Sequence, residues 1–146
     1  MFEFLQYRVE DVMTPDPVTV TPQTRLRELE ALFESHDFNG VPVVGDDHHL
    51  LGVVTKYDLL RAFGLSTQSI VPHYDDIMEQ TAESVMTADP ITVTPDLPLS
   101  RLLQLLLDRH NKSFPVTREG RLLGIVARED VLKALRRATQ HGEVGP

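Results

Sequence analysis

The chain lacks cysteine and tryptophan and contains no long apolar run. Without cysteine it can form no disulfide, no thiolate metal site and no thiol redox centre. No apolar stretch approaches the roughly 20 residues that a helix needs to span a bilayer. The first residues also lack the basic region and apolar stretch of a signal peptide. These absences predict a cytoplasmic protein that does not associate with membranes.

Basic residues are also scarce, with 14 Lys or Arg against 22 Asp or Glu and a formal net charge of -8. Non-specific binding to nucleic acid depends on basic surface, so we expect no nucleic-acid partner. A small anionic ligand remains compatible with this charge, because a few local cations and backbone amides can hold a phosphate. No motif pairs a nucleophile with a base or provides a metal-ligand cluster, so we expect no catalytic residue, no metal site and no required cofactor.

What the chain does contain is an internal repeat. Residues 12–22, Val-Met-Thr-Pro-Asp-Pro-Val-Thr-Val-Thr-Pro, return 73 residues later as Val-Met-Thr-Ala-Asp-Pro-Ile-Thr-Val-Thr-Pro at 85–95. Downstream, Pro42-Val43 recurs as Pro115-Val116, and Asp58 recurs as Asp130. At 146 residues the chain is long enough for one shared core, so we expect two similar halves with a ligand cleft between them.

Each copy has the same predicted order of elements, namely strand, helix, strand, strand, helix. This order predicts an α/β fold with a three-stranded mixed sheet and helices on one face. In the first copy, strands are expected at 18–20, 41–44 and 50–54, with helices after the N-cap Thr24 and from Thr55 to about Gly64. In the second copy, strands are expected at 91–93, 114–116 and 122–126, with helices from Pro98 and over 128–138. The predicted domains are a lead-in with repeat 1 (1–64), a linker (65–80), repeat 2 (81–138) and a C-terminal tail (139–146).

The segment Gly52-Val53-Val54-Thr55-Lys56-Tyr57-Asp58 is the best candidate for binding chemistry, because it joins a strand to a helix N-terminus. A carboxylate there can accept two hydrogen bonds from the vicinal diol of a ribose. Thr55-x-x-Asp58 is equally typical of a capping box, in which threonine and the acid satisfy the first helical amides. The second copy has Ala127 in place of the threonine and still keeps Asp130. Both interpretations therefore remain open.

These motifs, in order and twice, resemble the CBS domain, named after cystathionine β-synthase. The resemblance covers about residues 8–64 and 81–138, and two such domains in tandem are called a Bateman module. It implies two βαββα repeats related by a pseudo-twofold axis, with their sheets packed together and their helices outside. It also implies a regulatory module that binds an adenine nucleotide, such as AMP, ADP or ATP, or another adenosyl ligand such as S-adenosylmethionine.

The resemblance also implies which residues hold the ligand, with the acid of the Thr-x-x-Asp motif on the ribose hydroxyls. One site is expected to use Thr55 and Asp58 with Thr87, Asp89, Ile91, Lys112, Ser113, Phe114 and Pro115. The other is expected to use Asp130 with Thr14, Asp16, Val18, Asn39, Gly40 and Val41. Because Ala127 departs from the motif, we expect the second site to be weaker, empty or tuned to a different ligand. Lys112 is the main candidate for a phosphate-facing cation, ahead of Lys56, Arg118 and Arg128.

The resemblance further implies a homodimer of modules. No effector domain fits in the remaining residues, so we expect the signal to pass to a separate, unknown partner protein. The alternative is a structural or interaction module that acts through dimerisation with no bound nucleotide. An enzymatic interpretation has only Asp58 and Asp130 in its favour, and these acids are expected to serve separate sites and not one reacting atom.

Overall fold

The computed structural model describes residues 3–64 and 74–143, with side chains up to residue 140. The chain divides into two compact units. Unit 1 contains Met1–Pro17 and Ile91–Pro146, and unit 2 contains Val18–Pro90. Neither unit coincides with one sequence repeat, because the chain changes unit after Pro17 and again after Pro90.

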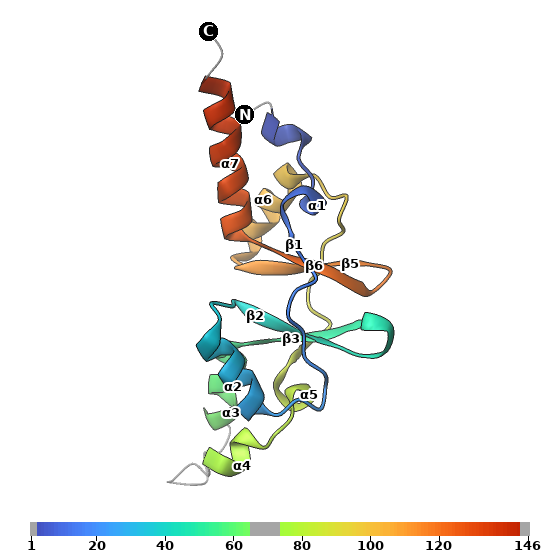
Figure 1. The fold of residues 1–146 in the computed structure, drawn as a ribbon, viewed down its shortest axis with the longest axis vertical. Helices are drawn as coiled ribbons and strands as arrows, with labels where there is room; N and C mark the ends of the chain where they lie inside the picture. Colours follow the sequence, from blue (N-terminus) through green and yellow to red (C-terminus); the bar gives the residue numbers. More distant parts are fainter. Residues whose placement is uncertain (1–2, 65–73, 144–146) are drawn as a thin grey trace. The chain divides into compact units, whose positions relative to one another are not determined.

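Unit 1 contains η1 (Glu3–Gln6), α1 (Val9–Val12), β1 (Thr14–Pro15), α6 (Leu99–Arg109), β5 (Ser113–Arg118), β6 (Arg121–Ala127) and α7 (Arg128–Glu143). Its sheet has the order β1-β6-β5, with antiparallel neighbours. β5 and β6 form a hairpin whose turn residues Glu119 and Gly120 both have positive φ, as a two-residue type I′ turn requires. α6 and α7 lie on one face of this sheet (Figure 1).

Unit 2 contains α2 (Leu26–Ser35), β2 (Gly40–Val44), η2 (Asp46–His48), β3 (Leu50–Thr55), α3 (Lys56–Gly64), α4 (Tyr74–Met78), α5 (Ala82–Val85) and β4 (Thr87–Ala88). Its sheet has the order β2-β3-β4, again antiparallel. α2 and α3 lie on one face of this sheet (Figure 1). The α/β class and the three-stranded sheet in each half, predicted from the repeat, are confirmed. The mixed strand direction predicted for each sheet is wrong, because all of its neighbouring strands are antiparallel and parallel pairing is limited to isolated bridges at Val20 and Val93.

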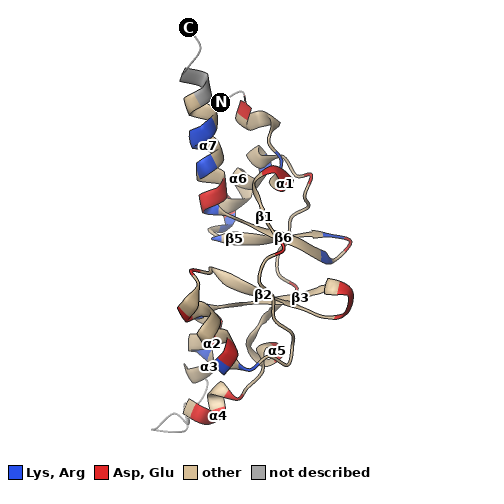
Figure 2. Cartoon of the chain, viewed as in Figure 1, with Lys and Arg blue, Asp and Glu red and all other residues tan. Residues whose placement is uncertain are grey.

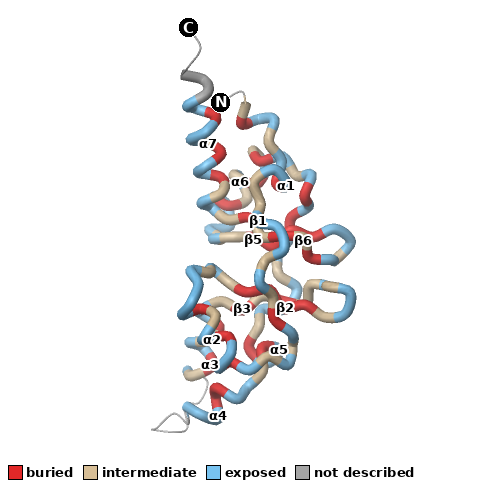
Figure 3. Tube along the Cα trace, in the orientation of Figure 1, coloured by how far each residue is buried: buried red, intermediate tan, exposed pale blue. Residues whose placement is uncertain are grey.

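Each unit has its own hydrophobic core between its helices and its sheet (Figure 3). Leu99, Leu102 and Phe114 are fully buried in unit 1, and Leu26 and Leu29 are fully buried in unit 2. The leucines come from the apolar stripes of α6 and α2, where a spacing of three residues keeps them on one helix face. Removing these stripes from water is the main favourable contribution to each unit.

The short edge strand of each sheet comes from the other sequence repeat. β1, from the first Met-Thr segment, pairs with β6 of the second repeat through Thr14–Ile125 and Pro15–Gly124. β4, from the second Met-Thr segment, pairs with β3 of the first repeat through Thr87–Val53 and Ala88–Gly52. The repeats therefore exchange their first strands.

Gly52 and Gly124 are required by this exchange. A Cβ atom added to Gly52 would lie 2.7 Å from the Thr87 carbonyl oxygen and 2.7 Å from Met86 Sδ. A Cβ atom added to Gly124 would lie 2.6 Å from the Thr14 carbonyl oxygen. Real Cβ atoms do not approach other atoms this closely, so the exchanged strand can pass only over a glycine.

The predicted strands at 18–20 and 91–93 are wrong in extent. Val20 forms only an isolated parallel bridge with Val43, and Val93 forms the equivalent bridge with Val116. The strand in each repeat lies earlier, in the Met-Thr segment. The β-branched residues Val-Thr-Val and Ile-Thr-Val favour extended backbone, but each segment makes only this one bridge to its unit's sheet.

Helix ends also differ from expectation. Arg25, and not Thr24, is the N-cap residue of α2, while Thr24 accepts a bond from the Thr21 amide. Pro98 is the N-cap of α6 and not its first helical residue. α7 continues to Glu143, past the predicted end at Ala138 and into the predicted tail. Most of the predicted linker, residues 65–73, lies outside the described residues, and its last part forms α4.

Candidate ligand-binding site

In unit 2, the step from β3 to α3 places Thr55 and Asp58 in contact. The Thr55 backbone N–H donates to Asp58 Oδ2 at 2.8 Å, and the Thr55 hydroxyl donates to the same oxygen at 3.0 Å. The Asp58 backbone N–H returns a bond to Thr55 Oγ1 at 3.2 Å. These reciprocal bonds form the capping box that was one of the two interpretations of this motif.

The second oxygen of Asp58 is engaged by groups outside the cap. Thr87 Oγ1 lies 3.4 Å from Asp58 Oδ1, and a guanidinium nitrogen of Arg61 lies 3.5 Å from it. Asp58 is only 2% exposed, and these donors balance the loss of water around its charge. A diol can therefore reach Asp58 only after displacing Thr87 or Arg61.

In unit 1, the equivalent carboxylate is more open. Asp130 Oδ2 accepts the Ala127 backbone N–H at 2.7 Å, which caps α7. Alanine supplies no hydroxyl, and among the residues that the structure describes no further hydrogen-bond donor reaches this side chain. Asp130 is half-buried. One of its two oxygens is thus available to a ligand hydroxyl.

Partial burial raises the pKa of the Asp130 carboxyl, and this effect exceeds the lowering by the Ala127 amide and by Lys133. The folded protein therefore binds a proton at Asp130 more tightly than the unfolded chain does. The free energy of unfolding then decreases as pH rises from the ordinary carboxyl pKa through the raised one.

We expect Asp130→Asn to remove this decrease, because an amide does not titrate and still caps the Ala127 N–H. Urea unfolding of wild type and variant between about pH 4 and pH 7 measures the difference. The variant should gain stability relative to wild type as pH rises. Glu129→Gln, on the same helical turn, controls for the loss of one negative charge. Parallel curves for Asp130→Asn and wild type would contradict the assignment.

The Met-Thr segments bring a second carboxylate into each unit. Asp16 follows β1 with a φ of 45°, and Asp89 follows β4 with a φ of 48°. Aspartate is one of the few residues other than glycine that adopts this left-handed backbone, and such strained positions concentrate at functional sites. Both side chains are exposed. Their repetition in both units makes these turns part of the candidate site.

The residues before the Pro-Val segments lie beside the capping motifs of the same unit. Gly40 is opposite Thr55 in the β2–β3 ladder, and Ser113 is opposite Ala127 in the β5–β6 ladder. Val41 and Phe114, the next residues along, are buried in the two cores. Each side chain packs inside the core of its own unit, so only the backbone groups of Val41 and Phe114 are available to a ligand.

The predicted residues therefore divide between the units. Unit 2 contains Thr55, Asp58, Thr87, Asp89, Val18, Asn39, Gly40 and Val41. Unit 1 contains Asp130, Thr14, Asp16, Ile91, Lys112, Ser113, Phe114 and Pro115. Each carboxylate of the capping motifs thus lies in one unit with the Met-Thr segment that the family resemblance assigned to it. The residues just before each Pro-Val segment were assigned to the carboxylate of the other sequence repeat. Each of these sets lies in the unit that does not contain its assigned carboxylate.

Among the candidate cations, Lys112 is exposed, whereas Arg128 is engaged. The Arg128 guanidinium donates to the His110 carbonyl at 2.8 Å and to the Asn111 carbonyl at 2.9 Å. It therefore ties the end of α6 to the start of α7. Its partners are backbone atoms, so no sequence signal indicates this role. Arg61, also not predicted, has a signal in its i,i+3 spacing from Asp58.

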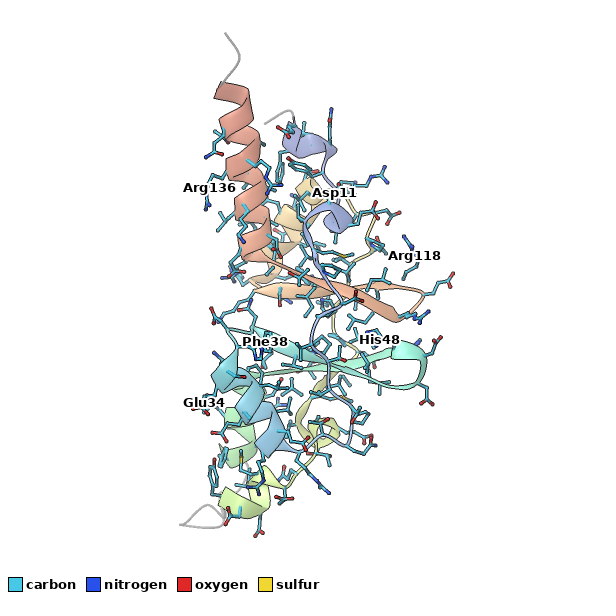
Figure 4. The ribbon with its side chains drawn as sticks, viewed as in Figure 1. Asp11, Glu34, Phe38, His48, Arg118 and Arg136 are labelled. Carbon is cyan, nitrogen blue, oxygen red and sulfur yellow. The ribbon has the colours of Figure 1, made fainter. Side chains whose placement is uncertain are left out.

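Among the described residues, the other polar features are not grouped into a site. His48 lies in the β2–β3 connection of unit 2, and Arg118 ends β5 in the hairpin of unit 1 (Figure 4). Within residues 3–64 and 74–140, no three acidic or histidine side chains are grouped to hold a metal ion. A hollow of about 480 Å³ in unit 2 lies between residues 19–24 and α2, and no candidate ligand residue lines it. Among the described helices, none is both long and apolar enough to cross a bilayer.

The fold and the repeated motifs define a tandem pair of small α/β domains. The CBS domain family matches residues 9–65 and 82–137, and the chain belongs to this family. The structure resembles CBSX2 from Arabidopsis thaliana, solved in complex with AMP, with a TM-score of 0.78 and 29% identity over 91% of this chain and 98% of that one. It also resembles a putative acetoin utilization protein, AcuB, from Vibrio cholerae, with a TM-score of 0.82 and 27% identity over 97% and 99% of the two chains.

Curated relatives include the uncharacterized protein MJ1225 of Methanocaldococcus jannaschii, 27% identical over 87% of this chain. The chain spans 42% of MJ1225 and 63% of the complete CBSX2. The similarity therefore establishes the tandem CBS pair and does not transfer the activity of a longer protein.

Proposed function

We propose that this CBS pair is a regulatory module that binds an adenine nucleotide or another adenosyl ligand and passes the signal to a partner protein. The observation that carries the proposal is the Asp130 carboxylate at the start of α7. Its geometry supplies a charged acceptor for a ribose hydroxyl, with one oxygen held by the helix cap and the other available. The AMP complex of CBSX2, a protein 29% identical to this chain, supports the choice of ligand class.

We propose that the two carboxylates differ in whether they must rearrange before they accept a ligand hydroxyl. Asp130 accepts a ligand without rearrangement, whereas Asp58 must first give up Thr87 or Arg61. This order reverses the expectation drawn from Ala127, because the missing hydroxyl opens the carboxylate and does not only remove a contact. The remaining predicted residues, with Lys112 as the phosphate-facing cation, are proposed to surround the ligands. Cytoplasmic location and homodimerisation are further parts of the proposal.

Thermal unfolding with AMP, ADP, ATP or S-adenosylmethionine tests the ligand class. A ligand at 100 times its dissociation constant adds about 2.7 kcal/mol to the free energy of unfolding. We expect Asp130→Asn to weaken binding about tenfold or more, because it replaces a charge-assisted bond with a neutral one. Asp58→Asn is the matched control and should have the smaller effect at the first site to fill.

The outcomes separate the alternatives. If none of the four compounds shifts the transition, the module acts through protein contacts without a nucleotide, and the proposal fails. If Asp58→Asn alone weakens binding, the ligand class holds and the proposed order of the two sites is wrong.

A further inference from the structure

In unit 2, the helix that carries Asp58 contacts the Met-Thr segment at two points. Thr87, the first residue of β4, places its hydroxyl 3.4 Å from Asp58 Oδ1. α3 also packs against α5, the short helix that ends at Val85 and leads into β4. All of these residues belong to the same unit. The Met-Thr segment therefore meets α3 at the carboxylate and at the end of α5.

The Arg61 guanidinium reaches both of these points. Arg61 Nη2 lies 3.5 Å from Asp58 Oδ1 and donates to the Val85 carbonyl at 3.5 Å. Both distances are long for charge-assisted contacts, and 48% of the Arg61 side chain is exposed. One nitrogen thus joins α3 to the end of α5, and it can turn out to water without disturbing the helix that carries it.

Basic residues are scarce around this carboxylate. Unit 2 holds four basic residues against twelve acidic ones, and Figure 2 shows acidic residues on α2 and α4. Arg25 donates to the Glu79 carbonyl, and Arg27 donates to the Glu79 carboxylate. Arg61 is therefore the arginine of unit 2 that is left to balance the buried charge of Asp58.

The equivalent position in unit 1 carries a different cation. Lys133 follows Asp130 by three residues, as Arg61 follows Asp58. Within the described part of unit 1, no ion pair joins Lys133 to Asp130. A guanidinium has several donors and can serve two acceptors at once, whereas an ammonium is a compact, strongly hydrated charge. The carboxylate with both oxygens engaged is thus the one followed by arginine.

We propose that Arg61 is a latch on the unit 2 site, which holds Asp58 to the Met-Thr segment until a ligand hydroxyl replaces it at Asp58 Oδ1. This inference rests on the proposed function and adds how its unit 2 site is controlled. Because one nitrogen makes both contacts, a ligand that displaces it from Asp58 also weakens its bond to the Val85 carbonyl. Ligand binding is thereby coupled to the link between α3 and α5.

Arg61→Met tests this link without any ligand, because methionine keeps an apolar side chain and removes the guanidinium. We expect the amides of residues 85–89 to exchange hydrogen about threefold faster, measured by mass spectrometry, while the amides of α2 remain unchanged. Lys133→Met is the matched control and should leave residues 12–16, the equivalent segment of unit 1, unchanged. Unchanged exchange at residues 85–89 in Arg61→Met would overturn the latch.

Calorimetric titration with adenosine tests the competition at Asp58, because adenosine has the ribose diol and no phosphate to attract the guanidinium. An Asp130→Asn background weakens the unit 1 site, so that the titration reports binding at Asp58. In this background, Arg61→Met should bind adenosine about threefold more tightly, which is the size of effect that a half-exposed ion pair supports. Lys133→Met should leave this affinity unchanged.

The other outcomes each contradict the latch. An affinity that Arg61→Met leaves unchanged or lowers would mean that Arg61 does not compete with the ligand. An equal gain in Lys133→Met would assign the effect to net charge. If wild type binds AMP but Arg61→Met binds no adenosine, the latch alone is wrong. If no protein in the series binds AMP or adenosine, the proposed function fails as well, and the exchange measurement then reports a link that is only structural.

Discussion

Replacing Gly124 with alanine is expected to lower the free energy of unfolding by about 3 kcal/mol, near the upper end for an overpacked site. The new methyl group would meet the Thr14 carbonyl oxygen at 2.6 Å and Met13 Sδ at 2.9 Å. The methionine side chain can move, but the carbonyl belongs to β1 and is fixed by its pairing with β6. Chemical denaturation followed by circular dichroism measures the loss.

Gly64→Ala is the matched control, because a Cβ atom there would meet, within 4 Å, no atom of the described residues beyond its chain neighbours and its own helix backbone. We expect it to leave stability unchanged or to raise it by about 0.5–1 kcal/mol, as alanine favours helix. Gly52→Ala should behave like Gly124→Ala, since the same exchange occurs in unit 2. Equal stability of the Gly64 and Gly124 variants would mean that the exchanged strand does not pass over Gly124.

Replacing Asp58 with alanine is expected to lower the free energy of unfolding by about 3 kcal/mol. Loss of the helix cap contributes about 1 kcal/mol. The half-buried Thr55 amide and hydroxyl, together with Thr87 and Arg61, then lose their shared acceptor, which adds about 1–3 kcal/mol. The same denaturation experiment measures this loss without any ligand.

Asp130→Ala provides the comparison for Asp58→Ala, because it removes a cap that consists of one bond to a half-buried carboxylate. We expect it to destabilise by about 1 kcal/mol. Equal losses of unfolding free energy in the two variants would show that the contacts of Thr87 and Arg61 with Asp58 do not stabilise the fold.

Several elements could be predicted from the sequence because their causes are local. The apolar spacing of Leu26 and Leu29, repeated at Leu99 and Leu102, predicted the helices α2 and α6 and their buried faces. The Pro-Val and Leu-Leu-Gly segments predicted the hairpin in each half. Helix ends were less accurate, because capping depends on contacts between distant residues, such as the bond that the Ala82 amide donates to the Thr24 carbonyl.

The sequence indicated the residues of the candidate site, but it did not indicate which carboxylate oxygens are hydrogen-bonded and which are free. The Thr-x-x-Asp spacing predicted the contact between Thr55 and Asp58. Nothing in that spacing shows that Thr87 and Arg61 close the remaining oxygen, since Thr87 reaches Asp58 only because β4 joins the sheet of unit 2. The substitution of alanine at 127 suggested a weakened site, whereas the structure shows a carboxylate with a free oxygen in its described surroundings.

The sequence by itself determined the repeat, the helices, the hairpins and the family, because each depends on residue periodicity or on motifs along one stretch of chain. Only the tertiary structure decided that the two Met-Thr strands are exchanged and that Gly52 and Gly124 leave room for them. It also decided that both oxygens of Asp58 are engaged, whereas one oxygen of Asp130 is free in its described surroundings. These features depend on which distant segments share a sheet. That choice follows from the packing of whole cores, which local periodicity does not specify.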